Sequence, residues 1–462
     1  MRPRRAPPAV TATALGAVAI VSGLGCERLG VVPRLDGAPF ARRDAGALDL
    51  AGLDRDEGAF VRPPTPRLPP VDREVTLPFD GPVVTEELEV ESDVGTLDVF
   101  FSIDTTGSFG GEIDELQAEL RGRIVPELRS RVADVAFGVG RFEDFGVAPF
   151  GAEGDAPFRL LTPITSDEAA VSSAVASLDR PLGDGGDVEE AGAEALYQIA
   201  TGEGFDPFVE PYDGEAARGG GTEGGVGFRP DALRVVVHVT DAPSHRPAAY
   251  AAGGIEGTRG WPETIEALSA VRAHTVGIAS GAPARPDLER VAVGTGAWTE
   301  PEDGACPTGV DGAERPPQDG RCPLVFDVRD DGSGLASAVV DGITGFLDTV
   351  RYAEVYGESD DGLGFVQAIE AVEATGPVGI ERADRRPAED GILDTFVDAP
   401  PGVTLRFRAV LRNTRIPPAD YDQIFRITVR VVGDGITLAT RTLRVVVPFG
   451  RLDAGTGQVD GG

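Results

Sequence analysis

The stretch Leu97-Asp98-Val99-Phe100-Phe101-Ser102-Ile103 runs directly into Asp104-Thr105-Thr106-Gly107-Ser108. Its first part is a nearly continuous apolar run, which is typical of a strand buried on both faces of a sheet. Its second part places one carboxylate and two hydroxyl groups at alternate positions. In an open parallel sheet, ligands bind in the loops at the carboxyl ends of the strands. This stretch therefore predicts both the class of fold and the place of a candidate site.

Strand and helix patterns alternate along the chain beyond this loop. The expected helices are 112–131, 167–178, 189–200, 262–272, 286–293 and 334–351, and the expected strands are 135–142, 233–240, 274–278 and 324–328. Such alternation is typical of an α/β fold whose sheet is mostly parallel. We expect residues 95–352 to form a doubly wound α/β domain with helices on both faces of the sheet.

A different periodicity begins after this domain. Apolar and polar residues alternate over 403–411 and 425–431, and Gly433-Asp434-Gly435 then predicts a tight turn into a further strand, 436–447. We expect residues 353–450 to form an antiparallel β-sandwich. Short strands within 73–94 are expected to pair with it, which would make the α/β domain an insertion in a β domain.

Composition excludes several classes of function. The chain has 462 residues, with 76 acidic side chains, 42 basic ones that are all arginine, and a formal net charge of −34. The lack of lysine excludes a Walker-type phosphate loop, a Schiff-base lysine and a kinase-type Lys–Glu pair. An acidic surface repels phosphate backbones, so no nucleic-acid partner is expected, whereas divalent cations are favoured.

The amino terminus has the features of an export signal. Arginines near the start precede an apolar run that ends in small residues before Cys26, so residues 1–25 are predicted to be a signal peptide. The stretch before Cys26 resembles a bacterial lipobox, which implies lipidation of Cys26 and an outer-membrane or cell-surface location. Free secretion or a periplasmic location is the alternative. A Pro/Arg-rich tether over 26–72 and a disordered tail over 451–462 are expected, with membrane contact only through the lipid anchor.

Cys306 and Cys322 are the remaining cysteines of the exported chain. They lie in a stretch rich in Gly, Pro and Asp that cannot pack a core by itself. In an oxidising compartment, a disulfide is the expected state of such a pair. A structural zinc site is not expected, because it needs four ligands.

Two further acidic turns follow the first motif at junctions of strands and helices. Thr240-Asp241 ends the strand expected at 233–240, and Gly186-Asp187-Val188-Glu189-Glu190 opens a helix. Carboxylate and hydroxyl oxygens together suit a hard divalent cation. The alternative is structural, because Thr106 and Ser108 could cap the following helix and the acids could complement a helix dipole.

Asp104-x-Thr106-x-Ser108 followed much later by Thr240-Asp241 resembles the metal-ion-dependent adhesion site of von Willebrand factor A (VWA) domains. The glycine turn with its acids resembles the variant in integrin β subunits and their bacterial relatives. The resemblance implies that Mg²⁺, or Mn²⁺ or Ca²⁺, is held by Asp104, Thr106, Ser108, Asp187, Glu190 and Asp241, with Glu190 favoured over Asp187 in the second loop. Glu112 alone is available for an adjacent second ion.

This resemblance implies a cell-envelope protein that binds through its metal an acidic residue of a protein partner, in adhesion or assembly, without catalysis. One alternative is a structural envelope protein whose ion only stabilises the fold. A second is a hydrolase that uses Ser244, His245 and Asp241. No elbow of the Gly-x-Ser-x-Gly type supports it, and neighbours in sequence are rarely triad partners. His238 is expected to be a packed core residue.

Overall fold

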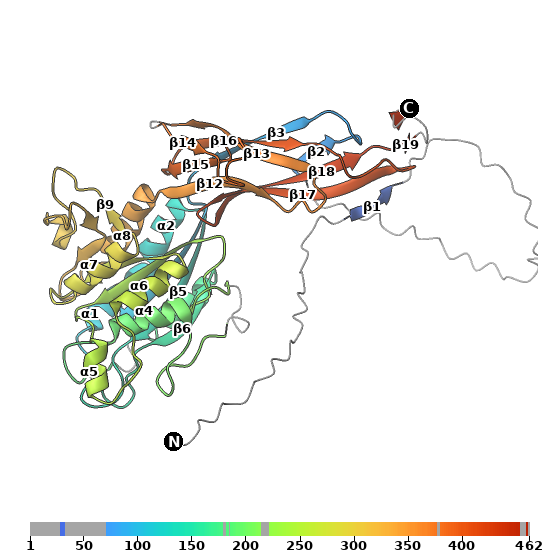
Figure 1. The fold of residues 1–462 in the computed structure, drawn as a ribbon. Helices are drawn as coiled ribbons and strands as arrows, with labels where there is room; N and C mark the ends of the chain where they lie inside the picture. The colour runs from blue at the N-terminus through green and yellow to red at the C-terminus, as the bar shows by residue number, and fades with distance from the viewer. Residues whose placement is uncertain are drawn as a thin grey trace, which may run out of the picture.

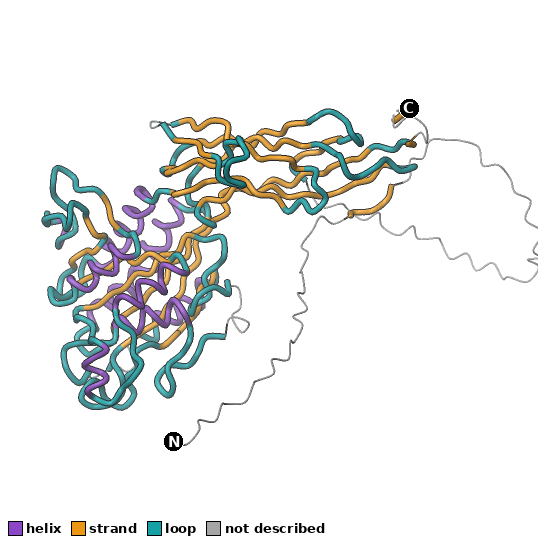
Figure 2. Tube along the Cα trace, viewed as in Figure 1, coloured by secondary structure: helices purple, strands orange, loops and turns teal. Residues whose placement is uncertain are grey.

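The computed structural model describes residues 28–32, 71–178, 182–183, 185–213, 221–376, 379–452 and 459–460. Two units are visible (Figure 1): an α/β unit and a unit built from strands. Helices gather in the first unit, whereas the described part of the second consists of strands and loops (Figure 2). The mixed α/β prediction is confirmed.

The α/β unit is built on a six-stranded sheet in the order β11-β8-β7-β4-β5-β6. The pairs β11–β8, β8–β7, β7–β4 and β4–β5 are parallel, and β6 is an antiparallel edge strand. The bounds of the strands are Thr96–Asp104 (β4), Asp134–Phe142 (β5), Arg159–Thr165 (β6), Leu233–Thr240 (β7), Ala273–Ala279 (β8) and Val325–Asp327 (β11).

Both faces of this sheet are covered by apolar side chains. Val99 and Phe101 of β4 belong to one core cluster, and Phe100 between them belongs to another, because successive side chains of a strand point to opposite faces. The first cluster includes residues of α1, α2, α3 and α8, and the second includes residues of α4 and α6. The helices are Gly110–Glu119 (α1), Val125–Arg131 (α2), Glu168–Val175 (α3), Gly192–Thr201 (α4), Pro247–Ala252 (α5), Trp261–Ala270 (α6), Arg285–Gly294 (α7) and Leu335–Thr349 (α8).

The expected helix 112–131 is not continuous, so this prediction is corrected. A π-helical turn, η1 (Leu120–Ile124), lies between α1 and α2. Pro126 follows at the start of α2, and it cannot donate a backbone hydrogen bond to the preceding turn. Such widened turns are a common adjustment inside α-helices. The helix expected at 189–200 begins only at Gly192, because the residues before it form a loop.

The second unit contains two sheets. The larger has the order β14-β15-β12-β17-β18-β2, with β1 also pairing with β17, and the smaller has the order β13-β16-β3. Apolar residues of both sheets share one core, and the rings of Phe396 and Phe407, one from each sheet, lie 5.1 Å apart. The bounds are Arg28–Val32 (β1), Arg73–Thr76 (β2), Val84–Glu91 (β3), Tyr352–Ser359 (β12), Val366–Thr375 (β13), Glu381–Ala383 (β14), Thr395–Ala399 (β15), Thr404–Leu411 (β16), Asp422–Gly433 (β17) and Ile436–Val447 (β18).

The α/β unit is inserted between strands of this second unit. β2 and β3 precede it in the chain, yet β2 pairs with β18 and β3 pairs with β16. Ser92, just after β3, donates its hydroxyl to Pro400 O, 2.6 Å away. The chain therefore enters and leaves the α/β unit from neighbouring places.

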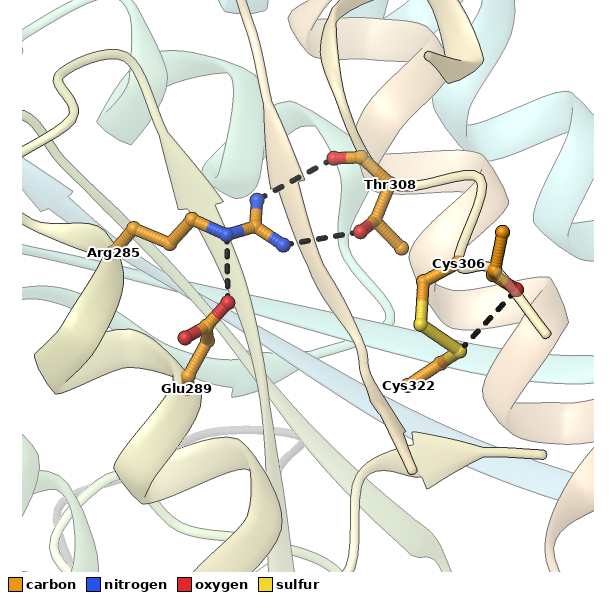
Figure 3. The surroundings of a disulfide bond; sticks show 6 residues. Arg285, Glu289, Cys306, Thr308 and Cys322 are labelled. Atoms are coloured by element: carbon orange, nitrogen blue, oxygen red, sulfur yellow. Dashed lines mark hydrogen bonds and ion pairs between the residues drawn. A yellow bond between two sulfur atoms is a disulfide. The ribbon is translucent and has the colours of Figure 1, made fainter. Parts of the chain in front are cut away.

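The disulfide between Cys306 and Cys322 is confirmed. Figure 3 shows it beside Arg285 of α7, whose Nε donates to Glu289 over 2.7 Å. The same guanidinium donates to Thr308 Oγ1 over 3.0 Å and pairs with Asp327 over 2.7 Å. Arg285 is buried, so these bonds tie the disulfide loop to the body of the unit. Short elements lie around it: Trp298–Thr299 (β9), Val310–Gly312 (η2) and Cys322–Pro323 (β10).

Several predictions fall outside the described residues. These are the signal peptide 1–25, the lipid anchor at Cys26 and most of the tether 26–72 and of the tail 451–462. Within the expected tether, Arg28–Val32 is the strand β1, which pairs with β17. Arg451–Leu452 (β19) and Val459–Asp460 (β20) pair in the tail. Among the described helices, none has the length and apolar character needed to cross a bilayer.

Candidate metal centre

Asp104 and Thr240 lie at the carboxyl ends of two adjacent parallel strands. Ile103 of β4 is paired with Val239 of β7, so the residues that follow meet at one edge of the sheet. The Thr240 hydroxyl donates to Asp104 Oδ2 over 2.7 Å. The backbone N–H and the hydroxyl of Thr106 donate to Asp104 Oδ1 over 3.0 and 2.8 Å. Three donors therefore fix the orientation of the Asp104 carboxyl group.

Asp104 is completely buried. Burial raises the pKa of its carboxyl group to about 7, and the nearby charge of Asp241 acts in the same direction. The hydrogen bonds from Thr106 and Thr240 oppose this shift without cancelling it. A buried carboxylate with no cation beside it is costly, and a bound cation would remove that cost.

Thr106 and Ser108 do not cap the following helix. The residue before α1 is Phe109, and no side chain caps this helix. Thr106 instead turns its hydroxyl to Asp104, with Ser108 Oγ 3.5 Å from it. Ser108 is exposed, whereas Thr106 is buried. Two hydroxyl oxygens thus lie between the buried carboxyl group and solvent, and the capping alternative is wrong for this motif.

Glu190 is buried on the loop before α4 and lies close to this motif. Its N–H donates to Pro243 O and its carbonyl accepts from His245 N, both over 3.0 Å, so the loop is bound to the segment after β7. A Cβ atom at Gly185 would lie 3.1 Å from Glu190 Oε1 and 4.0 Å from Thr106 Cγ2, so these two side chains flank the same glycine.

The Glu190 carboxyl group lies among other acids. Its Oε2 is buried and has no hydrogen-bond partner. Burial, together with the charges of Asp104 and Asp144, raises its pKa to about 10. Asp104 and Glu190 are therefore two buried acids at one edge of the sheet, and the charge of Asp104 destabilises the ionised form of Glu190.

Asp187 belongs to a different group of side chains. Its Oδ1 lies 3.0 Å from His245 Nε2, and Asp144 Oδ2 lies 3.4 Å from the same nitrogen. Ligand atoms of Asp144, Asp187 and His245 all lie within 4.8 Å of one another, as in a metal site. Tyr250 donates its hydroxyl to Asp144 Oδ1 over 2.7 Å, and burial raises the pKa of Asp144 to about 8.

Asp241 lies near both Asp104 and Glu112, because its charge raises the pKa of each. Asp241 is half-buried and packs against Gly281, where an added Cβ would come within 2.9 Å of its side chain. Glu112 is buried in the first turn of α1, and burial raises its pKa although Ser280 bonds to it. Its Oε2 has no hydrogen-bond partner.

The residues present fit a hard divalent cation. The Asp104 motif and Glu190 offer only oxygen ligands, which Mg²⁺, Mn²⁺ and Ca²⁺ prefer. The unpartnered Glu190 Oε2 is the kind of buried acceptor that a cation satisfies. The group of Asp144, Asp187 and His245, called here the Asp144 group, adds an imidazole. An imidazole suits Mn²⁺ or Zn²⁺ better than Ca²⁺. Two neighbouring cation sites are thus compatible with this edge of the sheet.

The sequence reasoning missed three contributors. Thr240 stands out in the sequence only as the neighbour of Asp241. Asp144 follows β5 as Asp104 follows β4, so a search for acids after every strand finds it. His245 was considered only with Ser244. Ser244 Oγ accepts from Ala193 N over 2.9 Å, while His245 Nε2 faces Asp187. His238 is buried and bonded to Ser102 over 2.9 Å, and burial lowers its pKa to about 3.

Comparisons with known proteins give likenesses in structure alone. No family model matches the chain, and neither does any curated protein. One similar solved structure is a von Willebrand factor type A protein from Catenulispora acidiphila, with 12% identity, 81% of this chain and 71% of that chain covered, and a TM-score of 0.32. Another is the pilus adhesin SpaC from Lactobacillus rhamnosus GG in its open conformation. The two sequences are 10% identical, the likeness covers 81% of this chain and 46% of that chain, and the TM-score is 0.29. The chain thus spans less than half the length of that adhesin.

Proposed function

We propose that this chain is a VWA-type binding protein of the cell envelope. A doubly wound α/β domain, carried on a β-sandwich, presents a divalent cation to an acidic residue of a protein partner. The supporting features are the strand order of the sheet and the acids and hydroxyls at its carboxyl edge. Binding occurs without turnover, in adhesion or in assembly of the envelope.

The observation that carries this proposal is the burial of Glu190 among other acids at the edge of the sheet where the buried Asp104 also lies. Burial and the charge of Asp104 raise the pKa of Glu190, and Glu190 Oε2 has no hydrogen-bond partner among the described residues. A fold that needed these acids only for packing would gain by replacing one of them with an amide. A divalent cation explains why both are present, because it neutralises both at once.

The roles follow from charge and exposure. Asp104 and Glu190 supply the negative charge, Thr106 and Ser108 supply neutral oxygens, and Asp241 adds charge at the rim. Ser108 is exposed, so the cation is reached from solvent on that side. The cation supplies an open coordination position that an external carboxylate can fill, and Mg²⁺ is the expected ion, with Mn²⁺ and Ca²⁺ as competitors.

The Asp144 group supports a second, auxiliary cation. Asp187 and Glu190 lie on one loop, so an ion at Asp187 would hold that loop in place for the ion at Asp104. We therefore assign Glu190, and not Asp187, to the principal site. Glu112, near Asp241, is the remaining candidate ligand for an adjacent ion.

The proposed location is outside the cytoplasm. A disulfide between Cys306 and Cys322 is stable in an oxidising compartment and rare in the cytosol. The export signal predicted for residues 1–25 and the lipid anchor predicted at Cys26 agree with this location. The rival proposal is that the ion only stabilises the fold. A measurement of partner binding distinguishes the two proposals.

The test compares metal and partner binding in the same preparations. EDTA-treated protein is titrated with Mg²⁺ while its melting temperature is measured, and envelope extracts are passed over immobilised protein in Mg²⁺ or in EDTA. Asp104→Ala should lose both the thermal response and the Mg²⁺-dependent capture, whereas the matched control Asp114→Ala, at an exposed position of α1, should keep both. A thermal response without any Mg²⁺-dependent capture supports the structural rival instead.

A further inference from the structure

A cavity of about 380 Å³ lies at the seam between the two units. It is lined from the α/β unit by the start of β7, the segment between α6 and β8, and the end of α7. The β unit contributes the segment from α8 into β12 and the turn between β17 and β18. This seam is at the amino ends of the parallel strands, opposite the metal edge. Small-molecule sites favour such seams, and this volume is in their usual range.

Residues of the two units contact each other across the seam beside the cavity. Thr437 of β18 donates its hydroxyl to Asp231, just before β7, over 2.8 Å. The guanidinium of Arg272 lies on Gly435, where an added Cβ would be only 1.6 Å from Nη1. The glycine at 435 therefore gives Arg272 the room to reach across the seam beside the cavity.

Arg272 is held there at a conformational cost. It follows α6 with a φ of 52°, a left-handed conformation that non-glycine residues seldom adopt. Within the described parts of the chain, its guanidinium has neither a hydrogen bond nor an ion pair. A full positive charge is thus presented beside the cavity without a protein partner.

Two other lining residues each hold one buried donor atom without a partner among the described residues. Nε of Arg234 and the hydroxyl of Tyr352 are buried and have no hydrogen-bond partner. The carboxylate of Asp434 is already occupied, because it accepts from Ala353 N and Glu354 N over 2.7 and 3.0 Å. Guanidinium groups can only donate. Because the Asp434 carboxylate is occupied, the guanidinium of Arg272 favours a ligand that carries hydrogen-bond acceptors.

Charge and apolar surface narrow the class of ligand. In a chain with a net charge of −34, the lining has three arginines, at 234, 272 and 351, against the single carboxylate of Asp434. Arg234 pairs with Glu223 and Arg351 pairs with Asp398, both outside the lining, which leaves Arg272 as the arginine of the lining without an ion pair among the described residues. Apolar lining comes from Pro230, Ala232, Leu233, Val350 and Ile436.

We infer that this seam cavity binds a small carboxylate with an apolar body, whose carboxylate pairs with Arg272 and whose body lies between the two units. Because both units line the cavity, the ligand binds only when they are docked, and it stabilises their junction by mass action. The inference does not depend on the metal centre, which lies at the other edge of the sheet.

The test uses octanoate as the probe and the full chain as the protein. Calorimetric titration should show one saturable site for octanoate, and 1-octanol and octyltrimethylammonium should bind at least about tenfold more weakly, because only the carboxylate forms charge-assisted hydrogen bonds. Arg272→Gln should weaken octanoate binding about tenfold or more, the loss expected for one such bond.

Two further variants complete the design. Ser269→Trp, at an exposed lining position, should block octanoate while leaving the circular dichroism spectrum unchanged. Arg123→Gln removes an exposed arginine of η1 that pairs with Glu127 and does not line the cavity, and it should bind octanoate like the unmodified chain. Absence of saturable octanoate binding overturns the inference. So does equal binding of 1-octanol, or undiminished binding by Arg272→Gln.

Discussion

Thr240 Oγ1 lies 2.7 Å from Asp104 Oδ2, which joins the ends of β7 and β4 at the candidate metal centre. Together with the two donors from Thr106, this bond fixes the direction of a carboxyl group that has no access to solvent. Groups that orient a metal ligand in this way usually contribute strongly to metal affinity, although they do not touch the ion.

Thr240→Val should therefore weaken Mg²⁺ binding without removing a ligand. The expected loss is about tenfold to a hundredfold in affinity, as for other partners of ligating side chains. Thr240→Ser keeps the hydroxyl and should restore most of the affinity. Calorimetric titration of EDTA-treated protein measures both. Equal affinities in the valine and serine variants would show that the hydroxyl does not act on the site.

The stability of the metal-free protein should fall as pH rises. In the unfolded chain, aspartate and glutamate ionise near about pH 4. In the fold, burial raises the pKa of Asp104 to about 7, that of Asp144 to about 8 and that of Glu190 to about 10. Between the unfolded and the folded values the native state holds more protons, so the free energy of unfolding decreases with rising pH.

Mg²⁺ should counter this decline, because it binds the deprotonated carboxylates. The rise in melting temperature on adding Mg²⁺ should thus be larger at about pH 8 than at about pH 5. Thermal unfolding in EDTA and in Mg²⁺ across this range measures the effect. Glu190→Gln should flatten the pH dependence in EDTA and reduce the Mg²⁺ response. Parallel curves with and without Mg²⁺ would be inconsistent with a cation among these acids.

The disulfide loop should contribute to stability through both its crosslink and its buried arginine. Cys306→Ser with Cys322→Ser opens a loop with a sequence separation of 16. The expected cost is about 3 kcal/mol. Arg285→Met leaves Glu289 and Asp327 without this cation, with an expected cost of about 3 to 5 kcal/mol. Urea unfolding measures both, and Arg290→Met, an exposed arginine of the same helix, is the control.

Because the α/β unit is inserted in the β unit, expressing parts of the chain separately tests this architecture. Residues 95–352 should fold alone, because they contain all six strands of their sheet. Residues 353–450 alone should not fold, because they lack β2 and β3, which pair with β18 and β16. Joining residues 71–93 to 353–450 through a short linker should restore cooperative unfolding. Independent folding of 353–450 would contradict the role of β2 and β3.

Much of the fold could be predicted because its strands carry distinct patterns. The buried run before Asp104 and the alternation over 403–411 match β4 and β16 closely. The edge strand β6 could not be recognised, because its sequence RLLTPIT contains a proline and alternates only weakly. The break near Pro126 required knowledge of how α1 and α2 pack on α8, which a helical period alone does not contain.

The site residues that directly follow a strand could be predicted from the sequence. Those whose position depends on the path of a loop were harder to predict. Asp104 and Thr106 follow a recognisable strand, so their proximity to Asp241 could be expected from the parallel sheet. The choice between Asp187 and Glu190 depended on the path of the loop before α4, which bonds to the segment 243–245. Asp144 and His245 meet only through that path, so the periodicity of their own segments did not reveal them.

The central claim is that a divalent cation binds at Asp104, Thr106 and Ser108 with Glu190 beside it. Crystals of the EDTA-treated chain soaked in Mn²⁺ and measured for anomalous scattering test this most directly, with crystals of Asp104→Asn as the control. The account predicts an anomalous peak in contact with the Asp104 carboxylate in the unmodified chain and none there in the variant. An unmodified chain without a peak at Asp104, or with one that persists in the variant, would contradict it.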